Sequence, residues 1–561
     1  MYILGISAYY HDSTAALIKD GKVIAAAEEE RFTRIKHDNS FPFNAIEFCL
    51  RYAGITIKDV KYIAFYEKPL RKFERIVQTF VETYPLSYIP FWRSIPDWVT
   101  NKLAIKSTIR KKLGYKGKIL FVPHHEAHAA STFYPSPFNK AAIFTVDGVG
   151  EWKTVGLYLG NRSNIIPLKE IHFPNSLGLL YSTFTAFLGF KVNEDEWKVM
   201  GLAAYGKPRY YDKFKKIVEI NGDGSFSLNM KYFSFRESFK MWSKETEKLF
   251  GKPRKPDEKV TQRHADIAAS LQKITEEIYL KILNHLYSLT KVKNLCIAGG
   301  VALNAVANGK IYSQTPFKRV FIQGAAGDNG AALGAALFVY HYLLKKRRNF
   351  VQRHLYFGSQ FSNEYIKNFL ERVGANYEFL EDEELVNKVA GLLAKNKVVG
   401  WFRGRMEFGP RALGARSILA NPKPKWMKDR VNEIKRREAF RPFAGSVLQE
   451  KVHEYFEVPE KNHYSPFMIF AFKVRKEKIK NIRAITHADG TCRIQTVNLR
   501  DNGIYYKLIR EFYKITGIPV ILNTSLNLKG EPIVCKPEEA YEDFIKTNMD
   551  CLVLENYLTY K

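Results

Sequence analysis

A pattern of strand, polar turn and hairpin occurs twice in the first 170 residues, and it constrains the fold more than any other feature. The copies lie about 140 residues apart, and their apolar segments are 2–7, 15–18 and 23–27, then 142–146, 155–159 and 165–168. Because internal duplication fixes an architecture, we predict two related α/β lobes that face a cleft. Chance similarity of two β-meanders is the alternative.

At 561 residues the chain is too long for one core, so we expect domains at 1–350 and 351–561, with an insertion at about 185–260. An apolar fraction of 46% excludes a disordered protein. Five scattered cysteines without C-x-x-C spacing favour a reducing compartment. The N-terminus resembles no secretory signal, and the longest apolar run is too short to span a bilayer. We therefore expect a cytoplasmic protein with no membrane partner.

The formal net charge of +30 is compatible with nucleic acid, an anionic membrane face or anionic substrates. Much of the positive charge lies in helical surface patterns, such as 102–112 and 207–216. A lysine-rich surface of the kind found in thermophiles explains it equally well. We favour that surface over nucleic-acid binding because no nucleic-acid motif is present.

Two histidines, His124 and His128, lie one helical turn apart in the segment Pro123–Ala129. On a helix both imidazoles reach the same face and could bind one metal ion. The alternative is a helix start with two buried, hydrogen-bonded histidines. Two ligands leave a metal site incomplete, so the rest of the chain must supply oxygen donors.

Two glycine-rich turns each follow a short apolar strand, at 299–304 and at 324–330. Glycines between a strand and a helix let backbone amides meet a phosphate, so the pair predicts a nucleotide cleft. Further along, the run 403–417 is dense in Arg, Gly and Pro, and 523–527 forms a polar turn. Guanidinium groups between glycines favour a grip on carboxylate or phosphate over a solvated loop.

Ordered motifs over nearly the whole chain resemble a known family. They are HDSTAALIKDGKVIAAAEEERFTRIKHD, HHEAHAAS, VDGVGEW, DEWKVMGLAAYG, GGVALN, GDNGAALGAA, EFGPRALGARS, FRPFAGSV, HADGTCRIQTV and LNTSLNLKGEPIV. This set resembles the carbamoyltransferases that modify nodulation factors, aminoglycosides of the tobramycin type, novobiocin and cephems. The resemblance implies an α/β fold with a duplicated actin/hexokinase-like (ASKHA) N-terminal domain and a YrdC-like C-terminal domain.

The resemblance also implies a reaction in two steps. The C-terminal domain would convert carbamoyl phosphate and ATP to carbamoyl-adenylate, phosphate and pyrophosphate. The N-terminal domain, which is similar to the metal-binding subunit of the tRNA threonylcarbamoyladenosine machinery, would pass the carbamoyl group to an acceptor hydroxyl and release AMP. An enclosed transfer protects the intermediate from water. The expected partners are carbamoyl phosphate and a hydroxylated, sugar-like small molecule.

Residue roles follow from the matched motifs. The implied metal ligands are His124, His128, Asp147 and Asp328, which suit Fe(II) or another divalent first-row ion. The expected cofactors beside it are ATP and Mg²⁺. The implied nucleotide contacts of the N-terminal domain are Lys198, Gly299, Gly300, Asn304, Gly327 and Asn329. His11 and Asp12 would meet the acceptor hydroxyl, with His11 either a general base or an orienting group.

The implied carbamoyl phosphate and ATP site of the C-terminal domain comprises Arg411, Arg416, Lys435, Arg441, Arg493, Asn523 and Ser525, with Arg441 and Arg493 in catalytic roles. Several cations can hold three or more anionic groups together. The run GLAAYG departs from the family's GLAPYG, and residues 85–115 and 205–260 carry no matched motif. We expect acceptor choice to lie there.

Two other functions stay open at this point. A fused carbamoyl-adenylate enzyme that modifies tRNA would account for the positive charge, although the C-terminal motifs match the small-molecule enzymes. A non-catalytic, nucleotide-regulated module of the actin-like class is the other. A homodimer is compatible with the sequence but not indicated by it.

Overall fold

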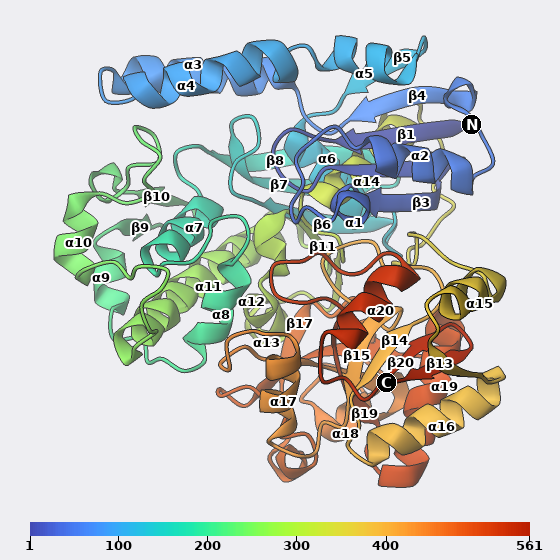
Figure 1. The fold of residues 1–561 in the computed structure, drawn as a ribbon. Coiled ribbons are helices and arrows are strands. Elements are labelled where there is room, and N and C mark those ends of the chain that lie inside the picture. The colour runs from blue at the N-terminus through green and yellow to red at the C-terminus, as the bar shows by residue number, and fades with distance from the viewer. The chain divides into compact units, whose positions relative to one another are not determined.

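The chain folds into two compact units, drawn in Figure 1. The computed structural model describes the backbone of residues 1–561 and every side chain except that of Asn101. Unit 1 comprises Met1–Glu29 and Asn39–Val351, and unit 2 comprises Glu30–Asp38 and Gln352–Lys561. Both combine sheets with helices, so the fold is mixed α/β.

Sheet A of unit 1 contains five strands in the order β3-β2-β1-β4-β5. Its strands are β1 (Tyr2–Ser7), β2 (Thr14–Lys19), β3 (Lys22–Glu28), β4 (Val60–Phe65) and β5 (Lys118–Phe121). The first three pair antiparallel, and β1, β4 and β5 are parallel. The interior of β1–β3 is almost continuously buried because both faces of the sheet are covered.

Sheet B has the order β12-β11-β6-β7-β8. Its strands are β6 (Lys140–Val146), β7 (Lys153–Asn161), β8 (Asn164–His172), β11 (Asn294–Ala298) and β12 (Arg319–Ile322). Again three strands pair antiparallel, and β6, β11 and β12 are parallel. The two sheets thus share one succession of strands, and their first three strands are the two copies of the sequence pattern.

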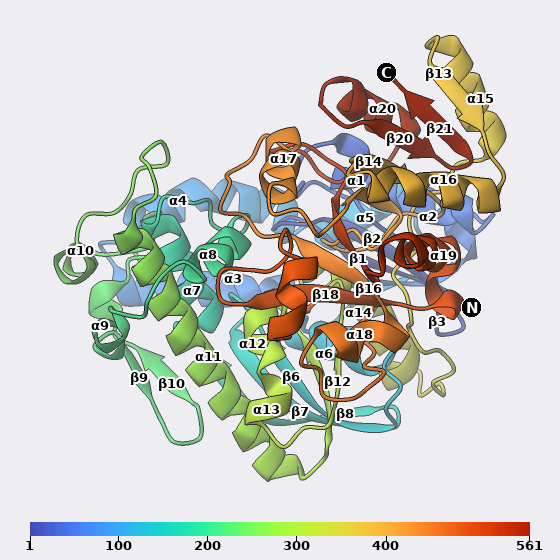
Figure 2. The ribbon, with the colours of Figure 1, turned by 90° about the horizontal axis from the view of Figure 1, so that it is seen from below.

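Two helices occupy equivalent places after the last strand of each sheet: α6 (His124–Phe133) follows β5, and α14 (Asp328–Leu337) follows β12. Helix α14 packs on sheet A, α6 packs on sheet B, and the helices pack on each other at the centre of unit 1 (Figures 1 and 2). Their approach is very close. A Cβ at Gly334 would lie 1.9 Å from the carbonyl oxygen of Ala127, and one at Gly5 would lie 1.9 Å from that of Ala332.

The other helices of unit 1 surround these layers. They are α2 (Phe43–Tyr52), α3 (Pro69–Thr83), α4 (Tyr88–Asp97), α5 (Ile105–Leu113), α7 (Leu177–Phe187), α8 (Glu196–Ala203), α9 (Tyr211–Lys215), α10 (Lys244–Phe250), α11 (Gln262–Thr290), α12 (Ala305–Gly309) and α13 (Ile311–Gln314). The segment expected to be an insertion contains α8 to α10 and the hairpin of β9 (Val218–Ile220) and β10 (Phe226–Leu228). Among the described residues, no helix is both long and apolar enough to cross a membrane.

Unit 2 is built on one mixed sheet of nine strands in the order β13-β21-β20-β14-β15-β19-β16-β18-β17. The strands are β13 (Asn376–Phe379), β14 (Val399–Phe402), β15 (Arg416–Ala420), β16 (Ala444–Leu448), β17 (Phe470–Lys473), β18 (Thr491–Val497), β19 (Val520–Ser525), β20 (Cys551–Leu554) and β21 (Tyr557–Tyr560). The helices are α1 (Glu30–Thr33), α15 (Asn363–Arg372), α16 (Asp382–Ala394), α17 (Met427–Ile434), α18 (Val452–Tyr455), α19 (Leu499–Thr516) and α20 (Pro537–Ile545).

The close contact of α6 and α14 predicts that one methyl group added at Gly334 destabilises the protein. Gly334→Ala should destabilise the protein by about 2 kcal/mol or more, because the backbone oxygen of Ala127 cannot move aside without separating the helices. Gly391→Ala in α16 is the control, since nothing lies within 4 Å of the added Cβ and alanine favours a helix by up to about 1 kcal/mol. Thermal unfolding measures both, and equal midpoints for the two variants would contradict the close crossing.

Candidate active site

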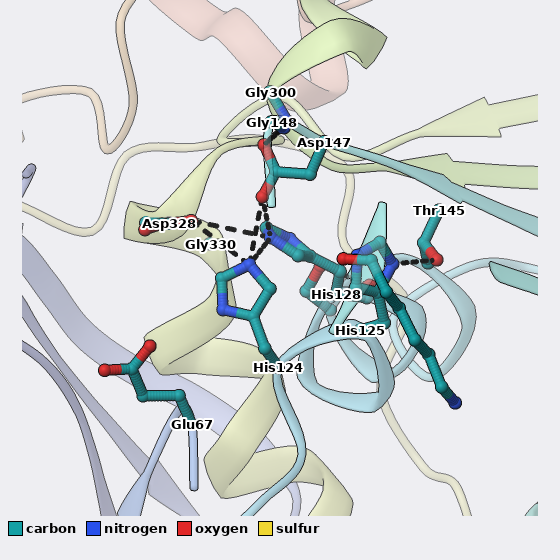
Figure 3. A network of polar contacts seen from close by, with 12 residues as sticks. Glu67, His124, His125, His128, Thr145, Asp147, Gly148, Gly300, Asp328 and Gly330 are labelled. Carbon is teal, nitrogen blue, oxygen red and sulfur yellow. Dashed lines mark hydrogen bonds and ion pairs between the residues drawn. The ribbon is translucent and has the colours of Figure 1, made fainter. Parts of the chain in front are cut away.

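Two imidazoles and two carboxylates from separate elements of unit 1 converge at the start of α6 (Figure 3). His124 and His128 project from α6, Asp147 from the turn after β6, and Asp328 from the first residue of α14. The Oδ2 of Asp147 lies 2.9 Å from Nε2 of His124 and 3.2 Å from Nε2 of His128. The Oδ1 of Asp328 lies 3.6 Å and 3.5 Å from the same two nitrogens. The structure thus brings together all four residues that the sequence assigned to a metal.

The backbone around these groups fixes their direction. The Oδ1 of Asp147 accepts hydrogen bonds from the amides of Gly148 at 2.8 Å and Gly300 at 3.2 Å, which leaves Oδ2 for the histidines. Gly299 has φ = 99°, and a Cβ there would lie 2.1 Å from the carbonyl oxygen of Val146. The two glycines of this turn are therefore needed to bring the end of β11 against the Asp147 turn.

The carboxylate of Glu151 binds backbone N–H groups beside the centre, including the one at the start of α6. This carboxylate accepts the backbone N–H of His124 at 3.0 and 3.1 Å, and that of Lys68 at 2.8 Å. A carboxylate at this place complements the positive N-terminal end of α6. His125 turns away and contacts Thr145 Oγ1 at 2.7 Å. The neighbouring histidine is therefore structural.

The donor set fits a first-row divalent ion. Ligands about 2.1 Å from an ion lie roughly 3.0–3.4 Å from one another, and the two Nε2 atoms are 3.1 Å apart. Among the described side chains, Asp328 Oδ2 and the Nδ1 atoms of both histidines are buried without a hydrogen-bond partner.

Burial lowers the pKa of His128, but Asp147 and Asp328 outweigh it and raise that pKa to about 9. Burial raises the pKa of Asp147, but the hydrogen bonds of His124 and His128 bring it well below its usual value. A cation bound here would balance the negative charge of both carboxylates, so the histidines would not need to be protonated.

His11 and Asp12 lie in the turn after β1, which is equivalent to the Asp147 turn after β6. His11 Nδ1 lies 2.9 Å from Asp12 Oδ2, and its Nε2 lies 4.0 Å from Asp328 Oδ2. Burial lowers the pKa of His11, but Asp328 and Asp12 outweigh it and raise the pKa to about 9. His11 and Asp12 therefore lie beside the centre, where His11 faces Asp328. Their catalytic role stays a prediction.

Several other residues lie beside the centre but were not predicted from the sequence, because no recognised motif includes them. The ring of Tyr66, directly after β4, lies edge-on to His124 with centroids 5.4 Å apart. The Tyr66 hydroxyl is buried and has no partner among the described side chains. Lys72 lies 2.7 Å from Glu67 and 4.5 Å from the ring centre of Tyr10. The only available signal was the position of Tyr66 and Glu67 at the end of a strand parallel to β1.

The predicted nucleotide contacts of unit 1 have partners within the protein. Asn304 caps α12 and exchanges hydrogen bonds with Gln272 at 3.0 and 3.1 Å. The side chain of Asn329 donates to Glu28 at 3.2 Å, and Lys198 pairs with Asp195 at 2.7 Å. At Gly327 an added Cβ would meet only Asn329, at 3.5 Å, so its glycine leaves room above the start of α14. These contacts hold the turns in place, and a nucleotide site there stays a prediction.

A second group of polar side chains lies in unit 2 and is cationic. Burial lowers the pKa of Arg411 well below its usual value, and Arg493 lowers it further. Arg437 is shifted in the same direction by burial, Arg441 and Arg493, and Lys435 by burial, Arg437 and Arg441. Burial likewise lowers the pKa of Arg493, to about 10. Of these five cations only Lys435 is buried, and the four arginines are partly exposed. A group of cations that repel one another is suited to a multiply charged anion, and an anion site there stays a prediction. Arg437 was not among the predicted site residues.

Three predicted residues of unit 2, among them Lys435 of the cationic group, have polar partners within the protein. Arg416 is fully buried, stacks 3.5 Å above the ring centre of Phe402 and donates to the carbonyl oxygens of Gly404 at 3.0 Å and Ser359 at 3.1 Å. Lys435 donates to Asn527 Oδ1 at 2.9 Å and to the backbone of Ser525. Asn523 donates to Ser446 at 3.0 Å in a buried network. Their predicted ligand roles are untested, and these contacts alone explain why the residues are polar.

Arg411 and Arg416 should respond oppositely to loss of charge. Arg411→Gln removes repulsion, so it should keep or raise the unfolding midpoint without ligand and shrink the rise caused by pyrophosphate. Arg416→Gln should lower the midpoint with or without pyrophosphate, because it breaks buried hydrogen bonds worth about 1–3 kcal/mol. A full pyrophosphate response in Arg411→Gln would contradict the anion site.

Comparison with known proteins gives the family. Residues 2–337 match the family model described as Carbamoyltransferase N-terminus, and residues 390–561 match Carbamoyltransferase C-terminus. An uncharacterized protein of Synechocystis sp. is 48% identical over 100% of this chain and 97% of its own length. The nodulation protein NolNO of Sinorhizobium fredii is 38% identical over 99% of this chain and 79% of its own. The nodulation protein U of Rhizobium tropici is 28% identical over 94% of this chain and 91% of its own. The chain belongs to the carbamoyltransferase family and is a transferase.

Proposed function

We propose that the protein is an ATP-dependent O-carbamoyltransferase with one site in each unit. Unit 2 forms carbamoyl-adenylate from carbamoyl phosphate and ATP, and unit 1 transfers the carbamoyl group to an acceptor hydroxyl. The observation that carries the proposal is the difference between the two sites. One is a cluster of buried and partly buried cations, and the other is a set of imidazoles and carboxylates. The matching strand order of sheets A and B supports a duplicated, actin-like unit 1.

In unit 2 the cations hold the substrates' phosphate groups. Water cleaves carbamoyl phosphate to carbamate and phosphate, and a carbamate oxygen then attacks the α-phosphorus of ATP. The bond to the β-phosphate breaks, and pyrophosphate leaves. Arg411, Arg437, Arg441, Arg493 and Lys435 supply the positive charge, which stabilises the anionic groups through the transfer.

In unit 1 the acceptor oxygen attacks the carbamoyl carbon, the bond to the adenylate oxygen breaks, and AMP leaves. His124, His128, Asp147 and Asp328 hold a divalent first-row ion, which supplies Lewis-acid stabilisation of negative charge. His11, which lies 4.0 Å from Asp328, either takes the acceptor's proton or orients the hydroxyl. The resemblance to enzymes that modify sugar-containing molecules supports a sugar-like acceptor.

Two variants separate the steps. Arg441→Ala should abolish pyrophosphate release from ATP and carbamoyl phosphate, because a guanidinium is lost from the anion site. His128→Ala should keep that release and block transfer, because the variant lacks one imidazole of the unit 1 centre. Pyrophosphate release measures the first step. A mass gain of one carbamoyl group on a sugar acceptor measures the second.

His172→Ala is the matched control, because His172 is half exposed and, among the described side chains, pairs with Glu170 alone. It should keep both steps. Loss of pyrophosphate release in His128→Ala would contradict the assignment of separate sites.

The unit 1 centre should bind a divalent ion without substrates. Co(II) titration, followed by its visible absorption, should give one ion per chain, with two nitrogen and two oxygen ligands from the protein. Asp328→Asn should weaken binding by at least about tenfold, since even outer-sphere changes cost 10–100-fold. Asp223→Asn, at the β9–β10 turn, should not change it. Equal affinity in the two variants would place the ion elsewhere.

A further inference from the structure

The helical hairpin of α3 and α4 carries an unusual amount of exposed apolar surface. Residues 70–99 hold eight of the twenty-six large hydrophobic side chains that are exposed in the described structure. The eight are Leu70, Val81, Tyr84, Leu86, Tyr88, Ile89, Trp92 and Val99. The segment is about a twentieth of the chain. Scattered exposed apolar residues are normal, but a contiguous set marks an interaction surface.

Four of the eight follow helical spacing along α4 and the segment Trp98–Lys102 directly after it. Tyr88, Ile89 and Trp92 lie within one turn of α4, and Val99 follows two turns later. Ile89 is 60% exposed and Trp92 is 55% exposed. The opposite side is already packed within the hairpin, where Phe80 of α3 stacks on Phe91 of α4 with ring centroids 4.0 Å apart. The exposed face is thus an extra surface that the hairpin's own core does not use.

The tip of the hairpin extends the same surface. Tyr84, Pro85 and Leu86 form the connection between α3 and α4, and all three are exposed. Figure 1 draws the two helices, in blue, as an arm that reaches past the strands of sheet A. An extended pair of helices can insert the apolar and aromatic side chains at its tip into a surface that it contacts.

The positive charge near the hairpin lies mainly in α5, which follows it. The hairpin itself exposes three basic residues and three acidic ones, which are Lys68, Arg71, Arg93, Glu74, Glu82 and Asp97. Residues 67–116 contain eleven lysines and arginines and four acidic residues. Arg71, Arg93, Lys106 and Arg110 are exposed, as are the adjacent Lys111 and Lys112. A second copy of this chain would bring a formal net charge of +30 against the same charge, which costs binding energy. Anionic phospholipid headgroups complement both the charge and the apolar face, since Trp, Tyr and aliphatic side chains settle at the headgroup boundary.

We propose that the exposed apolar surface of the α3–α4 hairpin, centred on Tyr88, Ile89 and Trp92 of α4, docks on an anionic phospholipid surface. The hairpin lies in the plane of the headgroups, with Trp92 and Ile89 inserted and the basic residues against phosphate. This is peripheral binding and needs no spanning helix, in accord with the lack of one among the described residues. It would replace the sequence-based expectation of no membrane partner. Docking needs no substrate, so it is independent of the proposed reaction.

Sedimentation with vesicles tests the surface on the full-length protein. The wild type should sediment with vesicles of phosphatidylglycerol and phosphatidylcholine, much less with phosphatidylcholine alone, and less at 0.5 M salt. Ile89→Ser/Trp92→Ser should bind the anionic vesicles at least about tenfold more weakly, because two exposed apolar side chains no longer enter the bilayer boundary. Arg93→Glu should also weaken binding.

The matched control is Trp426→Ser/Ile545→Ser, which removes the same two residue types at exposed positions of unit 2. It should bind like the wild type. Circular dichroism checks that every variant is folded. Equal binding by the two double variants would overturn the proposal, because charge elsewhere would then suffice. A wild type that ignores vesicles but dimerises, with the dimer lost in Ile89→Ser/Trp92→Ser, would also overturn it and assign the face to a second copy.

Discussion

The close crossing of α6 and α14 is the constraint on which the rest of unit 1 depends. Where Gly334 meets the backbone of Ala127 there is no room for a side chain, and Gly5 and Ala332 repeat the contact against sheet A. This crossing sets the start of α6, with its two histidines, beside the start of α14, with Asp328. Turns after the equivalent strands β1 and β6 then bring His11 and Asp147 to the same place. Gly334 and Gly5 thereby help to place the two helices that carry the histidines and Asp328, although neither glycine belongs to the centre.

The two sites use opposite electrostatics. In unit 1 the carboxylates of Asp147 and Asp328 raise the pKa of His128, so the centre favours a positive charge. In unit 2 Arg411 and Arg437 are partly buried beside other cations that lower their pKa values, which suits the anion site that we propose there. Each arrangement costs stability when no counter-charge is bound, because buried charge is poorly solvated. Such a cost is typical of functional sites and distinguishes Arg411 from Arg416, whose charge is used on backbone carbonyl groups.

Sequence reasoning reached the local parts of this structure and missed the non-local ones. The repeat of strands and the helix with His124 and His128 could be predicted from periodic patterns, and the convergence of Asp147 and Asp328 from the family resemblance. Tyr66 and Arg437 were missed, because a residue that follows a strand or a helix gains its meaning from neighbours distant in the chain. The inclusion of Glu30–Asp38 in unit 2 was missed for the same reason. Exposed residues such as Trp92 and Ile89 could not be recognised either, since helical spacing alone does not say which face is covered.

Anomalous diffraction from crystals of the protein loaded with Fe(II) tests the central claim most directly. The account predicts one strong peak at the iron edge between His124 Nε2, His128 Nε2, Asp147 Oδ2 and Asp328 Oδ1, with each donor about 2.0–2.2 Å from the ion. A peak bounded by other residues would contradict it, and so would crystals with no ordered iron whose four side chains keep the hydrogen bonds described above.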